Sequence, residues 1–105
     1  MAFVYLLSDY ESDNLCKIGV TRGKIENRIK QLQTGNGNEI YLKDYYETNY
    51  PFYIERLLHL KFSGKQKINE WFVLDNDSIF NFKKTCFEIE KNILSLKGNP
   101  FMKIK

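Results

Sequence analysis

The sequence has few residues of the kinds that cross-link a chain or anchor it in a membrane. Only two cysteines occur, Cys16 and Cys86, and they stand far apart in apolar surroundings with no secretory signal before them. We therefore expect reduced, buried thiols and not a disulfide. No apolar run approaches the length of a membrane span, and the N-terminal stretch turns polar at Ser8. We expect no targeting segment, no membrane contact and a cytoplasmic location.

The chain also lacks a strong excess of charge, internal repeats and low-complexity segments. Sixteen Lys and Arg against thirteen Asp and Glu give a net charge of +3, which permits a polyanionic partner without requiring one. A length of 105 residues with 43% hydrophobic side chains is enough for a single core. We predict one domain over residues 1–98 and a basic C-terminal tail over residues 99–105.

The apolar runs that are present predict an α+β fold. Residues 3–7 and 15–20 are short aromatic and branched runs separated by a polar turn, which indicates an antiparallel hairpin. Residues 39–47 alternate well enough to form a third strand beside it. Together they predict a small three-stranded, mainly antiparallel sheet, followed by a basic loop over residues 63–69 and a short strand or extended segment over residues 70–74.

Helical spacing of apolar residues predicts helices that flank this sheet. Ile25, Ile29 and Leu32 give one helix a buried stripe, and a second helix begins at Pro51. A long C-terminal helix follows the acidic cap at residues 75–77 and runs to Lys97. We assign its whole apolar stripe to the core, with Phe80, Phe87 and Leu94 widening that stripe.

The stretch from Leu15 to Gln33 has the pattern of an anion-binding edge. An apolar strand closes on Lys17-Ile18-Gly19 and is followed, after a polar bend, by a helix that carries Arg28. This arrangement places backbone N–H groups and a cationic side chain at one edge of a sheet, where a phosphate can be held. The hairpin also brings Tyr5 within reach of Lys17.

The second helix presents another face beside its core stripe. Phe52, Glu55, His59 and Phe62 follow one another at helical spacing, so Glu55 and His59 are stacked one turn apart. The single histidine, His59, is open to two interpretations. One is a satisfied interior histidine; the other is a second metal ligand, a proton carrier or a phosphate contact.

These elements in this order resemble the GIY-YIG nuclease superfamily. Phe3-Val4-Tyr5 stands where that superfamily has Gly-Ile-Tyr, and Lys17-Ile18-Gly19 stands where it has Tyr-Ile-Gly. The similarity is greatest to the Lys-Ile-Gly branch, catalogued as a bacteriophage ORF DNA-binding domain and as a meiotically up-regulated gene family. The matching pieces are Val4-Tyr5, Lys17 to Thr21, Arg28, Leu32 to Asn36, Glu55 with Leu58-His59, and Glu70-Trp71-Phe72. An asparagine late in the pattern corresponds to Asn69 or Asn76.

The resemblance implies hydrolysis of a DNA phosphodiester with one Mg²⁺ or Mn²⁺ ion, in a phage or viral setting. In these terms Glu55 binds the metal, Tyr5 activates or positions the attacking water, and Arg28 holds the scissile phosphate. A cation such as the metal or Lys17 is expected to lower the pKa of Tyr5, and Lys17 could supply that field. DNA contacts are expected from Thr21, Arg22, Asn36, Lys61, Lys65 and Lys67. The three lysines would bind the phosphates of the DNA backbone.

Two departures from the superfamily keep other functions open. Lys17 replaces its second tyrosine, and Leu32 replaces the histidine that many of its nucleases carry one turn after the arginine. The alternatives to an endonuclease or nickase are a DNA-binding module of the same fold without catalysis, and an interaction or small-anion-binding protein that reuses the pocket.

Overall fold

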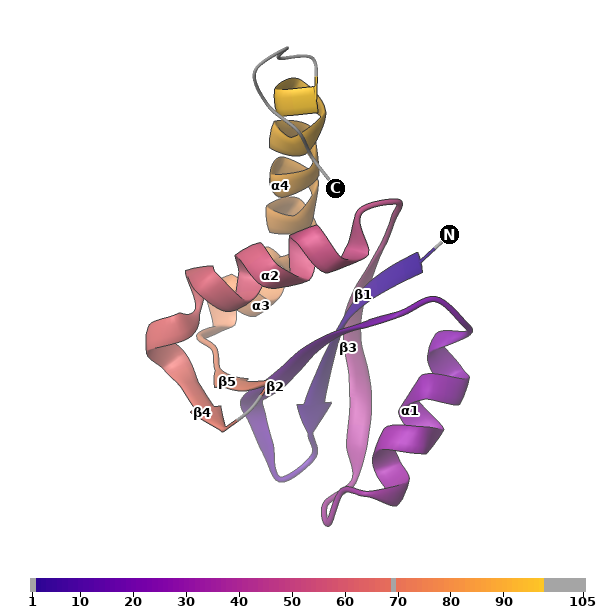
Figure 1. Ribbon diagram of the computed structural model, residues 1–105. Coiled ribbons are helices and arrows are strands. Elements are labelled where there is room, and N and C mark those ends of the chain that lie inside the picture. The colour runs from indigo at the N-terminus through magenta and orange to yellow at the C-terminus, as the bar shows by residue number, and fades with distance from the viewer. Residues whose placement is uncertain (1, 69, 98–105) are drawn as a thin grey trace.

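The chain forms a five-stranded antiparallel sheet flanked by helices, and the computed structural model describes residues 2–68 and 70–97 (Figure 1). The strands are β1 (Ala2–Asp9), β2 (Ser12–Thr21), β3 (Ile40–Thr48), β4 (Gln66–Ile68) and β5 (Trp71–Val73). The helices are α1 (Ile25–Thr34), α2 (Pro51–Lys61), the short 3-10 helix η1 (Ser63–Lys65), α3 (Asn76–Phe80) and α4 (Phe82–Lys97). The predicted α+β class and the long C-terminal helix are confirmed, while the predicted tail over residues 99–105 lies outside the described residues.

The predicted three-stranded unit forms one side of the sheet, whose strand order is β3-β1-β2-β5-β4. Strand β1 pairs with β2 on one side and with β3 on the other, so that Tyr5 lies opposite both Gly19 and Tyr45. The polar turn predicted over residues 9–14 is too long, because β2 already begins at Ser12. The Asp9 carboxylate accepts a hydrogen bond from the Glu11 backbone N–H at 2.8 Å, which closes a tight turn between the strands.

Two short strands extend the three-stranded unit, and one of them, β5, lies within the strand or extended segment predicted over residues 70–74. Strand β5 pairs with β2 over Leu15–Lys17, and β4 pairs with β5. Residues 63–68 of the predicted loop are therefore not simply a loop. The hairpin of β4 and β5 is too short to show a strand pattern, and the pairing of β5 with the distant strand β2 attaches it to the sheet. Within the described chain, β5 pairs with only Leu15–Lys17 of β2, and α2 also contacts β2.

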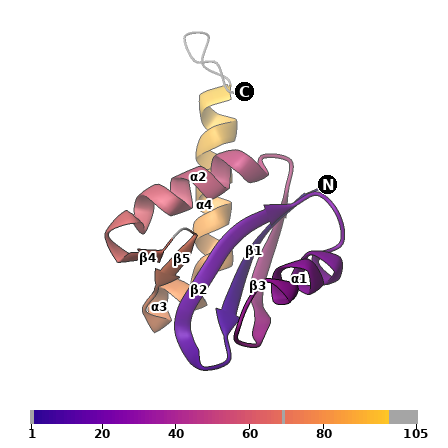
Figure 2. The same ribbon diagram turned by 60° about the horizontal axis from the view of Figure 1, so that its bottom comes forward.

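The sheet separates two apolar clusters. Val4 and Leu6 face α2 and α4 in the larger cluster, whereas Tyr5 and Leu7 face α1 in the smaller one. This division follows from the alternation of side chains along β1. Figures 1 and 2 show the same layering, with α1 on one side of the sheet and α2 and α4 on the other. Tyr5 is therefore held between the sheet and α1, and Gly19 lies opposite it on the paired strand.

The predicted last helix is interrupted, and its stripe is only partly core. Asp75 caps the short helix α3 by accepting a hydrogen bond from the Ser78 N–H at 2.7 Å, and the chain turns at Asn81 before α4 begins. Phe80, Phe87 and Leu94 are exposed, in contrast to the prediction. The reason is geometric: α4 contacts β3 and α2 along one stripe and extends beyond the sheet (Figure 1).

The predicted buried, free thiols are confirmed for Cys16 and Cys86. Among residues 2–68 and 70–97, none of the helices combines the length and the apolar character that crossing a membrane requires.

Candidate functional site

The centre of the candidate site is a close contact between Tyr5 and Gly19 across the β1–β2 hairpin. The Tyr5 side chain is 1% exposed, and a Cβ added at position 19 would lie 2.3 Å from its Oη atom. No real Cβ approaches an oxygen so closely, so position 19 has to be glycine. The glycine that the sequence assigns to the end of a strand therefore also provides the space that the Tyr5 hydroxyl occupies.

Two buried polar atoms at this centre have no partner among the residues that the structure describes. They are the Tyr5 Oη and the Arg28 Nε. Burial raises the pKa of Tyr5, and the neighbouring Arg28 opposes that rise. The hydroxyl is therefore protonated at neutral pH, and Arg28 is the cation that acts most strongly on it, where the sequence favoured Lys17. Buried groups left unpaired in this way are available to a ligand.

The unpaired hydroxyl leads to a prediction about stability. A buried hydroxyl without a hydrogen bond keeps its desolvation cost of about 1–3 kcal/mol. We expect Tyr5→Phe to leave the free energy of unfolding unchanged or to raise it by about 1 kcal/mol in urea denaturation.

Tyr46→Phe is the matched control for this prediction. The Tyr46 hydroxyl donates to the Glu90 carboxylate at 2.9 Å, so its removal should lower the free energy of unfolding by about 1 kcal/mol. Equal losses in the two variants would show that the Tyr5 hydroxyl is satisfied after all.

Lys17 is held by a residue that the sequence did not assign to the site. Its Nζ lies 3.0 Å from the Glu70 Oε2 and 5.8 Å from the centre of the Trp71 ring. Trp71 itself packs against the cluster that contains Tyr5, in agreement with a role in the core. The only signal for Glu70 was its place in Glu70-Trp71-Phe72, because its contact with Lys17 depends on the β2–β5 pairing.

Helix α2 brings Glu55 and His59 to the part of β2 that β5 leaves uncovered. The His59 Nε2 lies 3.0 Å from the Ile18 carbonyl oxygen, to which it donates, so the ring attaches α2 to β2. The interior interpretation of His59 therefore accounts for one ring nitrogen. Burial raises the pKa of the half-buried Glu55 carboxyl, with a smaller contribution from the charge of Glu70, while His59 and Lys17 act in the opposite direction.

Five side chains or backbone positions thus make up what we call the Gly19 site: Tyr5, Lys17, Gly19, Arg28 and Glu55. A carboxylate that is partly desolvated beside a second carboxylate favours a bound cation. Among the described residues, however, three or more His, Cys, Asp or Glu side chains are nowhere grouped as metal ligands. The donor set therefore fits a hard divalent ion only in the manner of Mg²⁺ sites that share one or two carboxylates with substrate phosphate.

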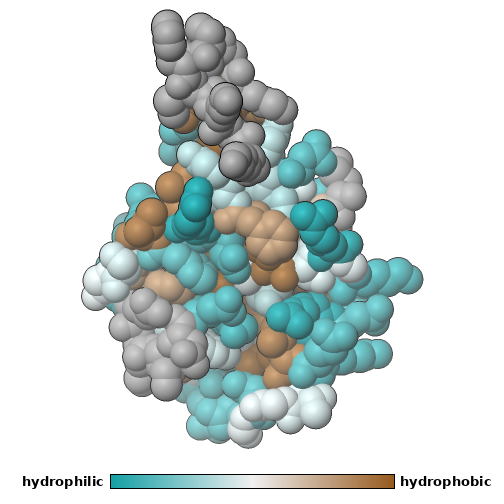
Figure 3. All heavy atoms as spheres, in the orientation of Figure 1, coloured by the Kyte–Doolittle hydropathy of each residue, from teal (hydrophilic) through white to brown (hydrophobic). Residues whose placement is uncertain are grey.

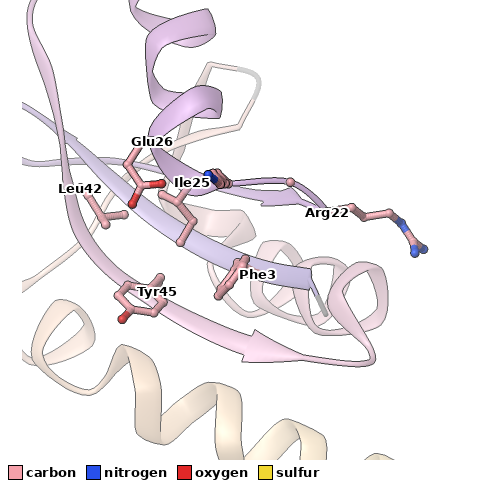
Figure 4. A pocket seen from close by; sticks show the side chains of 8 residues that line it. Phe3, Arg22, Ile25, Glu26, Leu42 and Tyr45 are labelled. Carbon is pink, nitrogen blue, oxygen red and sulfur yellow. The ribbon is translucent and has the colours of Figure 1, made fainter.

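The residues predicted to contact DNA are spread over the molecule. Thr21 accepts a hydrogen bond from the Gly23 N–H at 3.2 Å, and Arg22 is exposed at the end of β2. A hollow of about 430 Å³ lies between β1, β3 and the start of α1 (Figure 4). It is lined by Phe3, Arg22, Gly23, Lys24, Ile25, Glu26, Leu42 and Tyr45. In Figure 4 the Arg22 side chain points away from this hollow.

The remaining predicted contacts are not gathered at the Gly19 site. Asn36 lines a hollow of about 220 Å³ together with Lys17, so it shares a hollow with one residue of the Gly19 site. Lys61 is exposed at the end of α2, and Lys65 forms an ion pair with Asp75 at 3.3 Å. The side chain of Lys67 lies outside the described part of the chain, as does Asn69. Asn76 bonds to Asn14 at the opposite end of β2.

The fold and the site together define a small α+β domain with cationic and carboxylate side chains around a glycine at a sheet edge. The chain belongs to the T5orf172 domain family, whose model matches residues 2–92. Comparisons with curated proteins and with solved structures give no significant match. Membership of this family is compatible with a nuclease-like or DNA-binding module.

Proposed function

We propose that this protein is a divalent-metal-dependent DNA endonuclease or nickase of the GIY-YIG type. The observation that carries the proposal is a pair of buried polar atoms without hydrogen bonds in the described chain: the Tyr5 Oη, which lies against Gly19, and the Arg28 Nε. Within the described chain neither atom makes a hydrogen bond of good geometry, although the Arg28 side chain interacts with the Tyr5 hydroxyl strongly enough to oppose the rise of its pKa. A ligand that supplies the missing hydrogen bonds would remove the cost of burying the two groups. A phosphodiester with its attacking water offers acceptors for both.

The roles of the residues follow from their charge and surroundings. Arg28 offers forked, charge-assisted hydrogen bonds to phosphate oxygens. Tyr5, protonated at neutral pH, orients the attacking water by hydrogen bonding and does not act as its base. Glu55 would hold Mg²⁺ or Mn²⁺ together with phosphate oxygens and water. When bound, such an ion lowers the pKa of a coordinated water and neutralises charge on the phosphate.

One observation favours a second function, DNA binding without cleavage. Lys17 stands where the wider superfamily has tyrosine, and its ammonium is paired with Glu70 at 3.0 Å. Because Glu70 neutralises its charge, Lys17 is a weaker partner for phosphate. The ion pair also screens the negative charge of Glu70, the carboxylate that acts on Glu55. The same surface would then bind the DNA backbone and leave it intact.

Nicking of supercoiled plasmid distinguishes these two functions. We expect conversion to the open circle with Mg²⁺ or Mn²⁺ and none with a chelator. In parallel, the affinity for DNA should fall steeply with salt, because each neutralised phosphate adds about 0.9 to the slope of log K against log salt. Steep salt dependence without nicking would support the binding module. Binding that is insensitive to salt would exclude both functions.

A further inference from the structure

The first turns of α2 carry an exposed aromatic and arginine surface that the Gly19 site does not use. The Phe52 side chain is 56% exposed, and the Arg22 guanidinium lies 5.3 Å from the centre of its ring. The next residue after Phe52 is Tyr53, and the Arg56 guanidinium lies 5.5 Å from the centre of the Tyr53 ring. We call these four residues the aromatic platform. In the described part of the chain, these are the cation–π contacts made by arginine.

Two hollows lie on either side of the platform. One, of about 320 Å³, is lined by Phe52, Tyr53, Glu55 and Arg56. The other, of about 280 Å³, is lined by Arg22, Asn49, Tyr50, Pro51, Phe52 and Tyr53. Both rings border both hollows, and the first hollow also contains Glu55. The platform is therefore continuous with the carboxylate of the Gly19 site.

The chemistry of this surface suits a nucleotide whose base is unpaired. An exposed ring offers a stacking face to any base, and arginines beside it attract the phosphates. A base inside a duplex cannot use such a ring, because its faces are already covered by its neighbours. Phe80 is more exposed than Phe52 but has no cation–π partner among the described residues. An exposed ring therefore does not by itself produce the pairing of ring and arginine seen at Phe52. On the face shown in Figure 3, hydrophilic side chains border the apolar areas near α2.

We propose that the aromatic platform binds an unpaired nucleotide next to the phosphate held at the Gly19 site. The preferred substrate is then DNA with a single-stranded segment at the cleavage position, such as a flap, a gap or a loop, and not fully paired duplex. This inference rests on the proposed function, because the hollow shared with Glu55 links the base site to the phosphate site.

The binding test requires no cleavage and uses the whole chain with a chelator present. The probes are a DNA hairpin with a single-stranded extension, carrying 2-aminopurine at its first unpaired position, and the same hairpin without the extension. We expect the wild-type protein to quench the 2-aminopurine through stacking and to bind the extended hairpin more tightly. Quenching by the wild-type protein tests the platform even if a variant fails to fold.

Variants then identify the ring that stacks. Phe52→Ala should weaken binding of the extended hairpin about tenfold, abolish the quenching and leave binding of the paired hairpin nearly unchanged. Phe52→Trp should retain both effects. Phe80→Ala removes a ring that is 86% exposed on α3 and serves as the matched control, with no expected change.

Each outcome separates this inference from the proposed function. If the wild-type protein binds neither hairpin, the proposed function fails. If it binds both equally and does not quench the probe, or if Phe52→Ala weakens both to the same extent, the platform is not a site for an unpaired base. Neither equal binding without quenching nor equal weakening by Phe52→Ala would contradict the proposed phosphate chemistry at the Gly19 site.

Discussion

Replacement of Glu55 by glutamine is expected to abolish metal-dependent nicking while leaving the protein folded. Removal of residues that merely orient metal ligands typically costs 10–100-fold, so loss of a direct carboxylate ligand should cost at least about 100-fold. Stability should not fall, because burial already disfavours the charged form of this carboxyl, whose pKa is raised. The nicking rate with Mg²⁺ and with Mn²⁺ and the thermal unfolding curve are the two measurements.

Two comparisons make the Glu55 result specific. Glu88→Gln removes the same charge from an exposed position on α4 and should nick at the wild-type rate. Binding of DNA by Glu55→Gln in the presence of a chelator should equal or exceed that of the wild type, because one negative charge has left the surface. A Glu55→Gln protein that still nicks at the wild-type rate would exclude the proposed catalytic role.

The parts of the candidate site that the sequence placed correctly come from local patterns. A hairpin with a short turn fixes its own register, which sets Tyr5 opposite Gly19. Helical spacing then sets Arg28 on the helix after that strand and Glu55 on the next one. None of these placements requires knowledge of a distant contact.

The parts that the sequence missed depend on contacts between distant segments. Glu70 reaches Lys17 only because β5 pairs with β2, and a three-residue strand has too short a pattern to predict that pairing. The hydrogen bond from His59 to the Ile18 carbonyl joins residues far apart in the chain in the same way. Phe87 and Leu94 are exposed although their neighbours Cys86 and Ile93 are fully buried, so the exposure depends on how narrow the contacting stripe of α4 is, which its periodicity does not reveal.

The same physical feature connects the stability of the domain with its proposed chemistry. Tyr5 is nearly fully buried, and among the residues that the structure describes its hydroxyl has no hydrogen-bond partner and stands in the space beside Gly19. A side chain at position 19 would fill the space in which the hydroxyl stands. The glycine therefore serves the packing of the hairpin and the geometry of the site together.

Among the glycines that the structure describes, Gly19 should consequently be the one at which substitution by alanine is most damaging. The new methyl group would lie 2.3, 2.5 and 2.8 Å from three atoms of the Tyr5 ring and hydroxyl. The ring is buried between β1, β2 and α1, so it has little room to move, and overpacking of a core of this kind costs about 1–3 kcal/mol or more. Urea denaturation should reveal that loss in the free energy of unfolding.

A second substitution should remove the cause of the loss. Tyr5→Ala alone leaves a cavity and should cost about 3–5 kcal/mol. Adding Gly19→Ala to it should cost little more, because the atoms that collide are gone, so the double-mutant cycle should show a strong coupling between the two positions. Gly23→Ala is the matched control, since the nearest heavy atom to its added Cβ is 4.0 Å away. If Gly19→Ala proves as mild as Gly23→Ala, the close contact between Tyr5 and Gly19 does not exist in solution, and the site built on it fails as well.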